Sequence, residues 1–191
     1  MQKLVCLIQA FSQEQPFGLE LVQAYRQAAT EAGHALHFID IHALSFDPIV
    51  YPGNQALETD LQEAVQAIIA AQQLLIALPV YRDFMPTRSQ GFFRKIFHTD
   101  ALGRPLVALW GPHPDLPLKT ARILSLLDHY SWQEFKQART SRYHPLKKSV
   151  LEGLGFGKVY TTTIPPQYRN GSPDYHDKWI RKVAALGKKI S

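Results

Sequence analysis

The sequence predicts a single doubly wound α/β domain, residues 1–191, built around a parallel sheet of five strands. Apolar segments of strand length alternate along the chain with segments in which apolar residues recur at helical spacing. Parallel neighbours need crossover connections, which the intervening helices supply. The composition, 46% hydrophobic and 19% charged, suits one sizeable core, and the chain contains no repeat, low-complexity tract or linker that would mark a second domain.

The first part of the chain predicts two strands, each followed by a helix. Residues 3–10 form a nearly continuous apolar run, which is typical of a strand covered on both faces. After a loop at 11–17, a helix is expected from Gly18 to Gly33, where glycine is a natural C-terminal stop. The second strand is predicted at 35–41, an irregular loop with Asp-Pro and Pro-Gly pairs at 45–54, and the second helix at 57–71.

The second part of the chain continues this alternation. Residues 73–78 are apolar and predict a third strand that stops at Pro79. A short helix at 87–97 gathers several phenylalanines on one side, where they serve the core or a subunit interface. The β-branched segment 158–164 predicts the fifth strand. The other predictions are a fourth strand at 106–111, a proline-rich loop at 112–117, an amphipathic helix from there to about His129, a polar and aromatic insertion at 131–144, a short helix at 145–154, and a last helix at 174–190 capped by Ser172 or Asp174.

Composition and targeting signals exclude several classes of protein. The apolar runs are much shorter than the roughly 20 residues that span a membrane, and the N-terminus has no signal-peptide pattern. The single cysteine, Cys6, lies in an apolar segment and cannot form an internal disulfide. The 8 histidines show neither an HExxH motif nor metal-ligand spacing, so we expect no metal site. These observations predict a cytoplasmic protein without a membrane span.

The formal charge of +5 conceals an asymmetry along the chain. Residues 1–118 hold 7 basic and 11 acidic groups, whereas residues 119–191 hold 14 basic and 5 acidic ones. A basic half suits nucleic acid, an anionic membrane surface or an anionic cofactor such as NADPH. No motif for RNA or DNA binding accompanies it, so we expect no nucleic-acid partner, and a solvated helical surface is the simpler interpretation of the charge.

In a doubly wound sheet the ligand crevice lies beyond the carboxyl ends of the strands, where the strand order reverses. The loops at 11–18, 79–86 and 111–117 follow predicted strands, and each leads into a helix. The unpaired backbone N–H groups and partial positive charge of a helix N-terminus suit a phosphate dianion and need no lysine. We therefore expect these loops to form a site for a phosphorylated ligand.

Two segments of the chain resemble a known family. Residues 75–97, LIALPVYRDFMPTRSQGFFRKIF, are similar to its apolar strand, Pro-hydrophobic-aromatic turn, Met-Pro step and aromatic helix followed by a basic residue. Residues 38–50, FIDIHALSFDPIV, are similar to its segment V-D-L-x-x-x-x-F-D-P. With these motifs the chain resembles the flavodoxin-like NAD(P)H:quinone oxidoreductases, a group that includes the ancillary subunits of glutathione-gated potassium efflux systems. The resemblance covers most of the chain.

This resemblance implies a fold, a cofactor and a reaction. The fold is a flavodoxin-like doubly wound sheet of strand order 2-1-3-4-5 with helices on both faces. The cofactor is FMN, with FAD as the alternative, and NAD(P)H is the electron donor. A flavoprotein of this kind takes hydride from the nicotinamide and passes two electrons to a small quinone-like acceptor. Family members form homodimers that complete the flavin pocket across the subunit interface, and the ancillary subunits associate peripherally with a transporter.

The resemblance also assigns site residues. Tyr81 and Phe84 supply flat faces against the isoalloxazine ring, and backbone N–H groups of the same turn face the flavin edge. His113 is suited to stabilising negative charge on a reduced flavin or a quinone oxygen, so Tyr81 and His113 are the catalytic candidates. The cofactor-binding candidates are Ser12, Phe17, Gly18, Pro79, Val80, Tyr81, Arg82, Phe84, Met85, Trp110, Gly111, Pro112 and His113.

The first loop departs from the family pattern, which resembles H-S-x-R-x-S-F-N. It keeps Ser12 and Phe17, but Glu14 occupies the basic position, and Pro16 replaces a hydroxyl and removes one N–H donor. A phosphate tolerates Glu14 only where that carboxylate points to solvent. The alternative function is therefore a flavodoxin-fold regulatory or binding subunit with weak or lost flavin binding.

The basic groups after residue 118 bear on the choice of electron donor. They predict a weak preference for NADPH over NADH, because Arg and Lys usually meet the 2′-phosphate. Lys119 and Arg122 are the substrate-binding candidates, since both fall in the first turns of the helix expected after 112–117. Ordinary solvated helix charges are the simpler interpretation of both residues.

Overall fold

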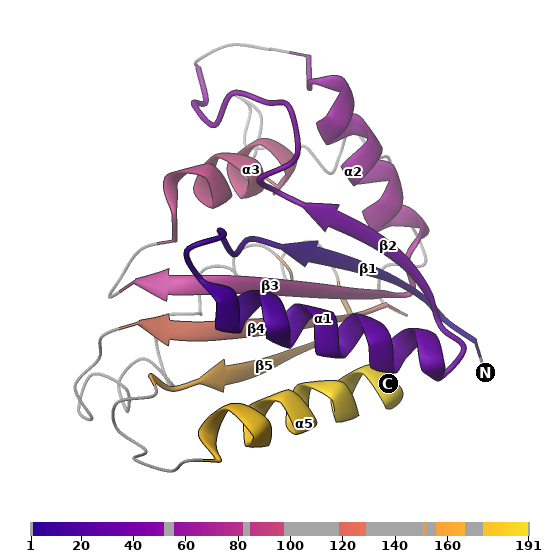
Figure 1. Cartoon of the computed structure of the whole chain (residues 1–191). Helices are drawn as coiled ribbons and strands as arrows, with labels where there is room; N and C mark the ends of the chain where they lie inside the picture. The colour runs from indigo at the N-terminus through magenta and orange to yellow at the C-terminus, as the bar shows by residue number, and fades with distance from the viewer. Residues whose placement is uncertain are drawn as a thin grey trace.

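The computed structural model of the chain describes residues 2–51, 56–81, 85–97, 119–128, 151, 156–166 and 174–190. Its centre is a parallel sheet in the order β2-β1-β3-β4-β5 (Figure 1). The strands are β1 (Leu4–Gln9), β2 (Ala35–Asp40), β3 (Gln73–Tyr81), β4 (Thr120–Asp128) and β5 (Lys158–Ile164). This order confirms the predicted flavodoxin-like doubly wound sheet.

Helices cover both faces of the sheet, as predicted (Figure 1). On one face lie α1 (Pro16–Glu31) and α5 (Tyr175–Lys188), and on the other lie α2 (Thr59–Ala70) and α3 (Thr87–Phe97). Successive strand residues face opposite sides, so Cys6 joins the apolar cluster under α2 and α3 while Leu7 joins the cluster under α1 and α5. Burial of both faces explains why the strands are continuous apolar runs.

The α1 helix begins two residues earlier than predicted, because Pro16 takes its first position. Proline suits that position, since its fixed φ is helical and its missing N–H would have no partner there. The helix ends at Glu31, and Gly33 has a φ of 82°, a left-handed conformation that glycine adopts without strain. The predicted C-terminal stop at Gly33 is thus confirmed.

The prediction of an amphipathic helix after Pro117 is wrong, because 120–128 form strand β4. This strand lies between β3 and β5 and is apolar on both sides. Ile123 belongs to the cluster under α2 and α3, and Leu124 belongs to the cluster under α1 and α5. A short apolar run of this kind fits a buried strand and a buried helix equally well by periodicity, and only the sheet decides between them.

The third strand also differs from the prediction, since β3 continues through Pro79 to Tyr81. The carbonyl of Ala77 accepts a hydrogen bond from the N–H of Ala10, 2.9 Å away, so Ala77 faces β1. Pro79, two residues on, faces the same side, where the pairing of β1 with β3 ends at Ala77. The missing N–H of Pro79 therefore breaks no ladder bond, while pairing with β4 continues to Tyr81.

Several predicted elements lie outside the described residues. These are the strand at 106–111, the loop at 112–117 and the insertion at 131–144, together with all of the helix at 145–154 except Leu151. Ser172, one candidate cap of the last helix, is also outside. The other candidate, Asp174, takes the N-cap position of α5, but its side chain makes no capping hydrogen bond.

The aromatic face of α3 packs inside the domain. Phe92 and Phe93 of α3 are buried in the apolar cluster under α2 and α3, so they are core residues. They offer no exposed surface for a dimer contact. Arg88 fixes the helix to the loop after β2 by donating from Nε to the carbonyl oxygen of Ile41 at 3.0 Å and from Nη2 to that of Leu44. This contact sets α3 at the carboxyl ends of β2 and β3.

One buried thiol and two buried phenols make the stability of the fold sensitive to alkaline pH. Burial raises the pKa of Cys6 to about 12 from an ordinary 9.0, and raises the pKa values of Tyr25 and Tyr175 to about 12 from 10.0. In the unfolded chain Cys6 loses its proton near pH 9.0 and the two tyrosines lose theirs near pH 10.0, while the folded chain keeps all three. The free energy of unfolding is therefore independent of these groups below pH 9.0 and falls as the pH rises from there toward 12. The free energy of unfolding, measured in urea from about pH 8 to about pH 11, should record that fall. An unfolding free energy that does not change over this range would contradict the prediction.

Candidate functional site

The candidate site lies at the carboxyl edge of the sheet, where the chain leaves β1 and β3. These strands are neighbours, and their last paired residues are Gln9 and Ala77. The chain turns from β1 into the loop at 11–15 and then into α1, whereas β3 continues past this point to Tyr81. The predicted phosphate loop and the end of β3, where the predicted flavin turn begins, therefore lie side by side.

The loop before α1 is a closed turn. The N–H of Gln15 donates to the carbonyl oxygen of Ser12 at 3.0 Å, and the N–H of Ser12 donates to Oε1 of Gln15 at 3.0 Å. Phe17 and Gly18 then occupy the second and third positions of the helix, where backbone N–H groups have no partner within the helix. The turn thus presents two amide donors at the positive end of the α1 dipole.

Gln9 and Phe11 hold this turn against the sheet. The Gln9 side chain is buried and bonds Phe11 twice, because Nε2 donates to the carbonyl oxygen at 3.0 Å and Oε1 accepts from the N–H. The ring of Phe11 lies against Gly18 so closely that an added Cβ would be 2.7 Å from Cε1 of Phe11. Glycine at position 18 is therefore required for the start of α1 to reach its place on Phe11.

Phe17 does not face the open side of the loop. Its ring stacks on the imidazole of His176 with centroids 4.2 Å apart and planes 12° apart, and it also contacts Tyr175. The hydroxyl of Tyr175 donates to the carbonyl oxygen of Pro165, just after β5. The side chain of Phe17 thus ties the start of α1 to the start of α5, and only its backbone N–H remains suited to a ligand.

The donors at the start of α1 fit the phosphate of a flavin mononucleotide. Two helix N–H groups and the half-buried hydroxyl of Ser12 are neutral donors of the kind that bind phosphate. Glu14 is exposed, so water solvates its carboxylate, which meets the condition for tolerating a phosphate nearby. Pro16 removes no useful donor, since the first helical position is where proline is accommodated best.

The second part of the candidate site is the end of β3. Pro79 and Val80 are buried within the sheet, and the Val80 side chain belongs to the cluster under α2 and α3, so only their backbone suits a ligand. Tyr81 is the last residue of the strand. Met85 is half-buried, and its carbonyl oxygen accepts a hydrogen bond from Nε2 of Gln90 at 2.9 Å. The candidates Arg82, Phe84, Trp110, Gly111, Pro112 and His113 lie outside the described residues.

The two residues predicted to contact a nucleotide phosphate lie elsewhere. Lys119 precedes β4 at the end of the sheet where strands begin, and its Nζ donates to the carbonyl oxygen of Ile69. Arg122 is half-buried within β4, where Nη1 donates to Oγ1 of Thr162 at 3.0 Å. The prediction placed both residues in a helix, but this segment is a strand. Contrary to the prediction, neither residue lies at the carboxyl edge.

Arg122 instead contributes to the packing between β4 and β5. Its guanidinium lies 4.9 Å from the centre of the Tyr160 ring, and burial lowers its pKa. We expect Arg122→Met to lower the free energy of unfolding by about 2 kcal/mol, because the hydroxyl of Thr162 and the ring of Tyr160 lose their partner. Urea unfolding measures this. A change in the ratio of activities with NADPH and NADH in this variant, with unchanged stability, would contradict the assignment.

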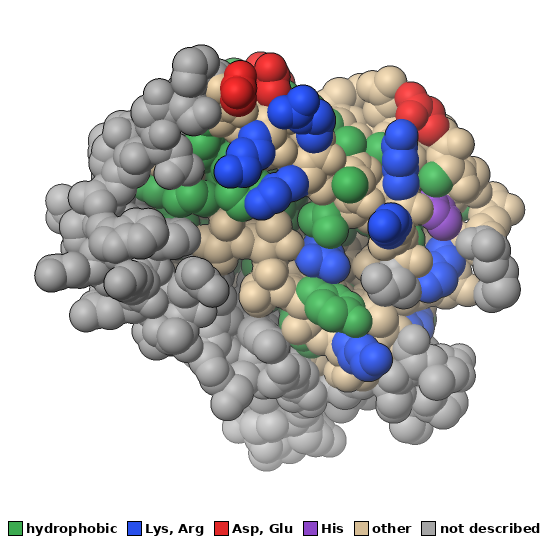
Figure 2. Space-filling model, turned by 90° about the horizontal axis from the view of Figure 1, so that it is seen from below, with side chains coloured by type: hydrophobic (Ala, Val, Ile, Leu, Met, Phe, Trp, Pro, Cys, Tyr) green, Lys and Arg blue, Asp and Glu red, His purple; other side chains and the backbone are tan. Residues whose placement is uncertain are grey.

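Five basic residues of the second half lie exposed on α5 and at its end. Figure 2 views the molecule from below Figure 1, and on its described surface Lys and Arg side chains spread over this side with acidic ones at the margin. The exposed basic residues of α5 and its end are Lys178, Arg181, Lys182, Lys188 and Lys189. They recur along one face of the helix, away from its apolar face, which is the pattern of a solvated surface. Among the described helices, none is long and apolar enough to cross a membrane.

Sequence reasoning missed two residues that shape the site. Gln9 fixes the first loop, and the signal for it was a polar residue at the end of an apolar strand. Arg88 fixes α3, and a lone arginine in the first turn of a helix gave no comparable signal because its partners are backbone carbonyls 44 and 47 residues away. Contacts of this kind follow from the fold and have no local pattern.

Comparison with known proteins gives structural neighbours only. No protein-family model and no curated sequence matches the chain. The NAD(P)H:quinone oxidoreductase from Methanothermobacter marburgensis has a TM-score of 0.76 at 15% identity, over 100% of this chain and 97% of that one. An FMN-dependent NADH-azoreductase from Bacillus anthracis in complex with FMN has a TM-score of 0.65 at 10% identity, over 98% of each chain. This similarity over nearly the full length of both chains shows that the present chain has their fold.

Proposed function

We propose that this chain is a flavin-dependent NAD(P)H oxidoreductase that binds FMN and reduces a quinone-like acceptor. The observation that carries the proposal is the pair of helix N–H groups at Phe17 and Gly18 beside the end of β3, at the carboxyl edge where doubly wound proteins bind ligands. The names of the structural neighbours support it, since they include a quinone oxidoreductase and an FMN-dependent azoreductase. The sequence resemblance supports the same class.

In this proposal the chain binds and orients the cofactor. The start of α1 and Ser12 hold the phosphate, while Tyr81 and Phe84 at the end of β3 and just after it hold the ring. Bound FMN supplies the hydride-accepting and two-electron chemistry, so the protein needs no nucleophile or acid–base pair of its own. Its contributions are stacking, backbone hydrogen bonds and exclusion of water from the ring.

The proposal includes a homodimer, in keeping with the family that the chain resembles. The phenylalanines of α3 are buried and do not supply the contact. The loop after β2 offers apolar surface instead, because Ile49, Val50 and Tyr51 are 54%, 43% and 47% exposed. Light scattering should give about twice the chain mass of 21.7 kDa, and a monomer at micromolar concentration would count against a shared pocket.

Replacement of the proposed ring contacts tests the cofactor site. Tyr81→Ala and Phe84→Ala should each weaken FMN binding by about 1 to 3 kcal/mol, the contribution of a buried aromatic contact. Fluorescence quenching of free FMN measures the dissociation constant. Arg181→Ala serves as the control, since it removes an exposed side chain of α5 that belongs to the solvated surface. Wild-type affinity in both site variants would refute the ring placement.

A second candidate function follows from Glu14. This carboxylate lies in the loop that would bind the phosphate, and its negative charge opposes that binding. The second candidate is therefore a regulatory subunit with weak or lost flavin binding, because the same fold serves both functions. If this is correct, Glu14→Arg should convert a chain without measurable FMN affinity into one that binds it. If the wild-type chain already binds FMN tightly, this second candidate function is contradicted.

A further inference from the structure

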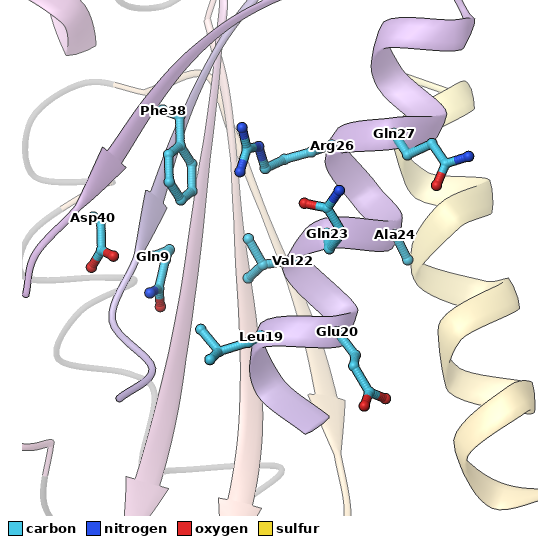
Figure 3. Close-up of a pocket in the computed structure, with 10 residues that line it drawn as sticks. All are labelled: Gln9, Leu19, Glu20, Val22, Gln23, Ala24, Arg26, Gln27, Phe38 and Asp40. Atoms are coloured by element: carbon cyan, nitrogen blue, oxygen red, sulfur yellow. The ribbon is translucent and has the colours of Figure 1, made fainter. Parts of the chain in front are cut away.

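The turn that follows β2 lies beside the loop that precedes α1. The last residues of β1 and β2, Gln9 and Asp40, are paired in register, so both chain segments leave the sheet at the same place. Figure 3 shows that the ends of the two strands also lie next to the early part of α1, since one hollow is lined by Gln9, Asp40, Leu19 and Glu20. Side chains of the turn after β2 are therefore neighbours of the loop at 11–15, which is proposed to hold the FMN phosphate.

The charged side chains at this place are mostly carboxylates. Glu14 and Glu20 are exposed, and Asp40 is half-buried. The loop at 11–15 contains no basic residue, and the dipole of α1 supplies only about half of a positive charge. Arg88 binds two carbonyl oxygens of the turn after β2, but it does so from α3. A cationic group on the side of the loop would therefore strengthen the binding of a phosphate against these negative charges.

His42 holds an imidazole ring at this place. Its Nε2 lies 3.3 Å from the carbonyl oxygen of Ala10, and because a carbonyl oxygen only accepts, Nε2 carries the proton of this hydrogen bond. The backbone of the same turn is closed by two further bonds, since Oδ1 of Asp40 accepts the N–H of His42 at 2.9 Å and the carbonyl oxygen of Asp40 accepts the N–H of Ala43 at 3.0 Å. His42 is nevertheless exposed, so its ring is oriented by the protein and open to a ligand.

The imidazole of His42 lies close enough to share a phosphate with the loop. Ala10, its hydrogen-bond partner, is two residues before Ser12, and two residues of extended chain span about 7 Å at most. Two donors that bind opposite sides of one phosphate are about 4 to 8 Å apart, because each hydrogen bond is about 2.8 Å long. The ring of His42 and the loop at Ser12 can therefore contact the same phosphate group.

We propose that His42 binds the phosphate of FMN as an imidazolium, with Nε2 on the carbonyl oxygen of Ala10 and Nδ1 donating to a phosphate oxygen. The inference rests on the proposed function and adds a positively charged group to the neutral donors at the start of α1. Both nitrogens of an imidazolium donate, so the bond to Ala10 and the bond to the phosphate form together. The bond to Ala10 also orients the ring before the cofactor binds, which lowers the entropy lost on binding.

A comparison of FMN with riboflavin tests this role, because the two flavins differ only in the phosphate. Quenching of flavin fluorescence by the full chain gives both dissociation constants. His42→Ala should weaken the binding of FMN about tenfold, as expected for the loss of one charge-assisted hydrogen bond at an exposed place, and should leave the binding of riboflavin unchanged. His37→Ala is the matched control, since it removes an exposed histidine from the middle of β2. It should bind both flavins like the wild type.

Two further variants separate the charge of His42 from its hydrogen bond to Ala10. Glutamine can donate to the Ala10 carbonyl but carries no charge, so His42→Gln should lose the preference for FMN as His42→Ala does. Arginine is always charged and binds phosphate well, so His42→Arg should keep that preference. A full preference for FMN in His42→Gln, or an equal loss of affinity for both flavins in His42→Ala, would show that His42 only holds the turn and would overturn the inference.

The same titrations separate this inference from the proposed function. If the preference for FMN depends on His42 but neither NADH nor NADPH reduces the bound flavin, the inference is supported and the oxidoreductase function is overturned. If the bound flavin is reduced and His42→Ala keeps the wild-type preference, the function is supported and the inference is overturned. A wild-type chain that binds no FMN overturns both.

Discussion

Gly91→Ala should lower the free energy of unfolding by about 2 kcal/mol. Gly91 lies in α3 against the backbone of the loop after β2, and an added Cβ would be 2.7 Å from the carbonyl carbon of Pro48. Neither backbone segment yields easily, since Arg88 already fixes α3 to the same loop. Overpacking of this kind costs about 3 kcal/mol, and the better helix propensity of alanine offsets about 1 kcal/mol. Urea unfolding monitored by circular dichroism measures the difference.

Arg94→Ala is the control for this prediction. Arg94 is an exposed residue of the same helix, so its replacement should change stability by less than about 0.5 kcal/mol. If Gly91→Ala proves as stable as Arg94→Ala, then α3 does not pack on Pro48 as the structure has it. The position of α3 at the carboxyl edge beside β3 would then be wrong as well.

Gly18→Ala should weaken FMN binding by about tenfold and also lower stability. The added methyl group would occupy the place of the Phe11 ring, so the ring or the start of α1 must move. Either movement displaces the N–H groups of Phe17 and Gly18 that are proposed to bind the phosphate. The dissociation constant from fluorescence quenching, measured well below the unfolding temperature, reports the change.

Gly187→Ala gives a matched control for the phosphate loop. An added Cβ at Gly187 would be 2.6 Å from the carbonyl oxygen of Tyr25, so this variant presses on the middle of α1 and spares its start. Both variants should lose stability, but only Gly18→Ala should lose FMN affinity. Equal losses of affinity would mean that general destabilisation of α1, and not its N-terminus, controls cofactor binding.

The sequence predicted the sheet because burial on both faces leaves a visible apolar run. The strands at β1 and β5 and the helix α3 were predicted closely, since each has turn residues or proline at its ends. The segment that forms β4 is misassigned because ARILSLL is mostly apolar and its neighbours in space, β3 and β5, are distant in sequence. Local pattern cannot show which apolar run enters the centre of a sheet.

The candidate site was predicted in outline and less well in detail. Gly18 lies in the first turn of α1 and Ser12 in the loop before it, as the topology requires, because a helix follows the first strand of every doubly wound sheet. Phe17 was expected at the ligand, but its side chain stacks on His176, from a helix 159 positions later in the chain. Arg122 was placed at the rim and lies in the sheet instead. Side-chain roles depended on distant partners in both cases.

Anaerobic titration of the full chain with FMN, followed by NADH, tests the central claim most directly. The account predicts one FMN bound per chain, with quenched flavin fluorescence, and loss of the oxidised-flavin absorbance when NADH is added. Admission of a soluble quinone should then restore that absorbance. A chain that leaves FMN fluorescence unchanged at micromolar concentration, or that binds FMN and shows no bleaching with either NADH or NADPH, would contradict the proposal of a flavin-dependent oxidoreductase.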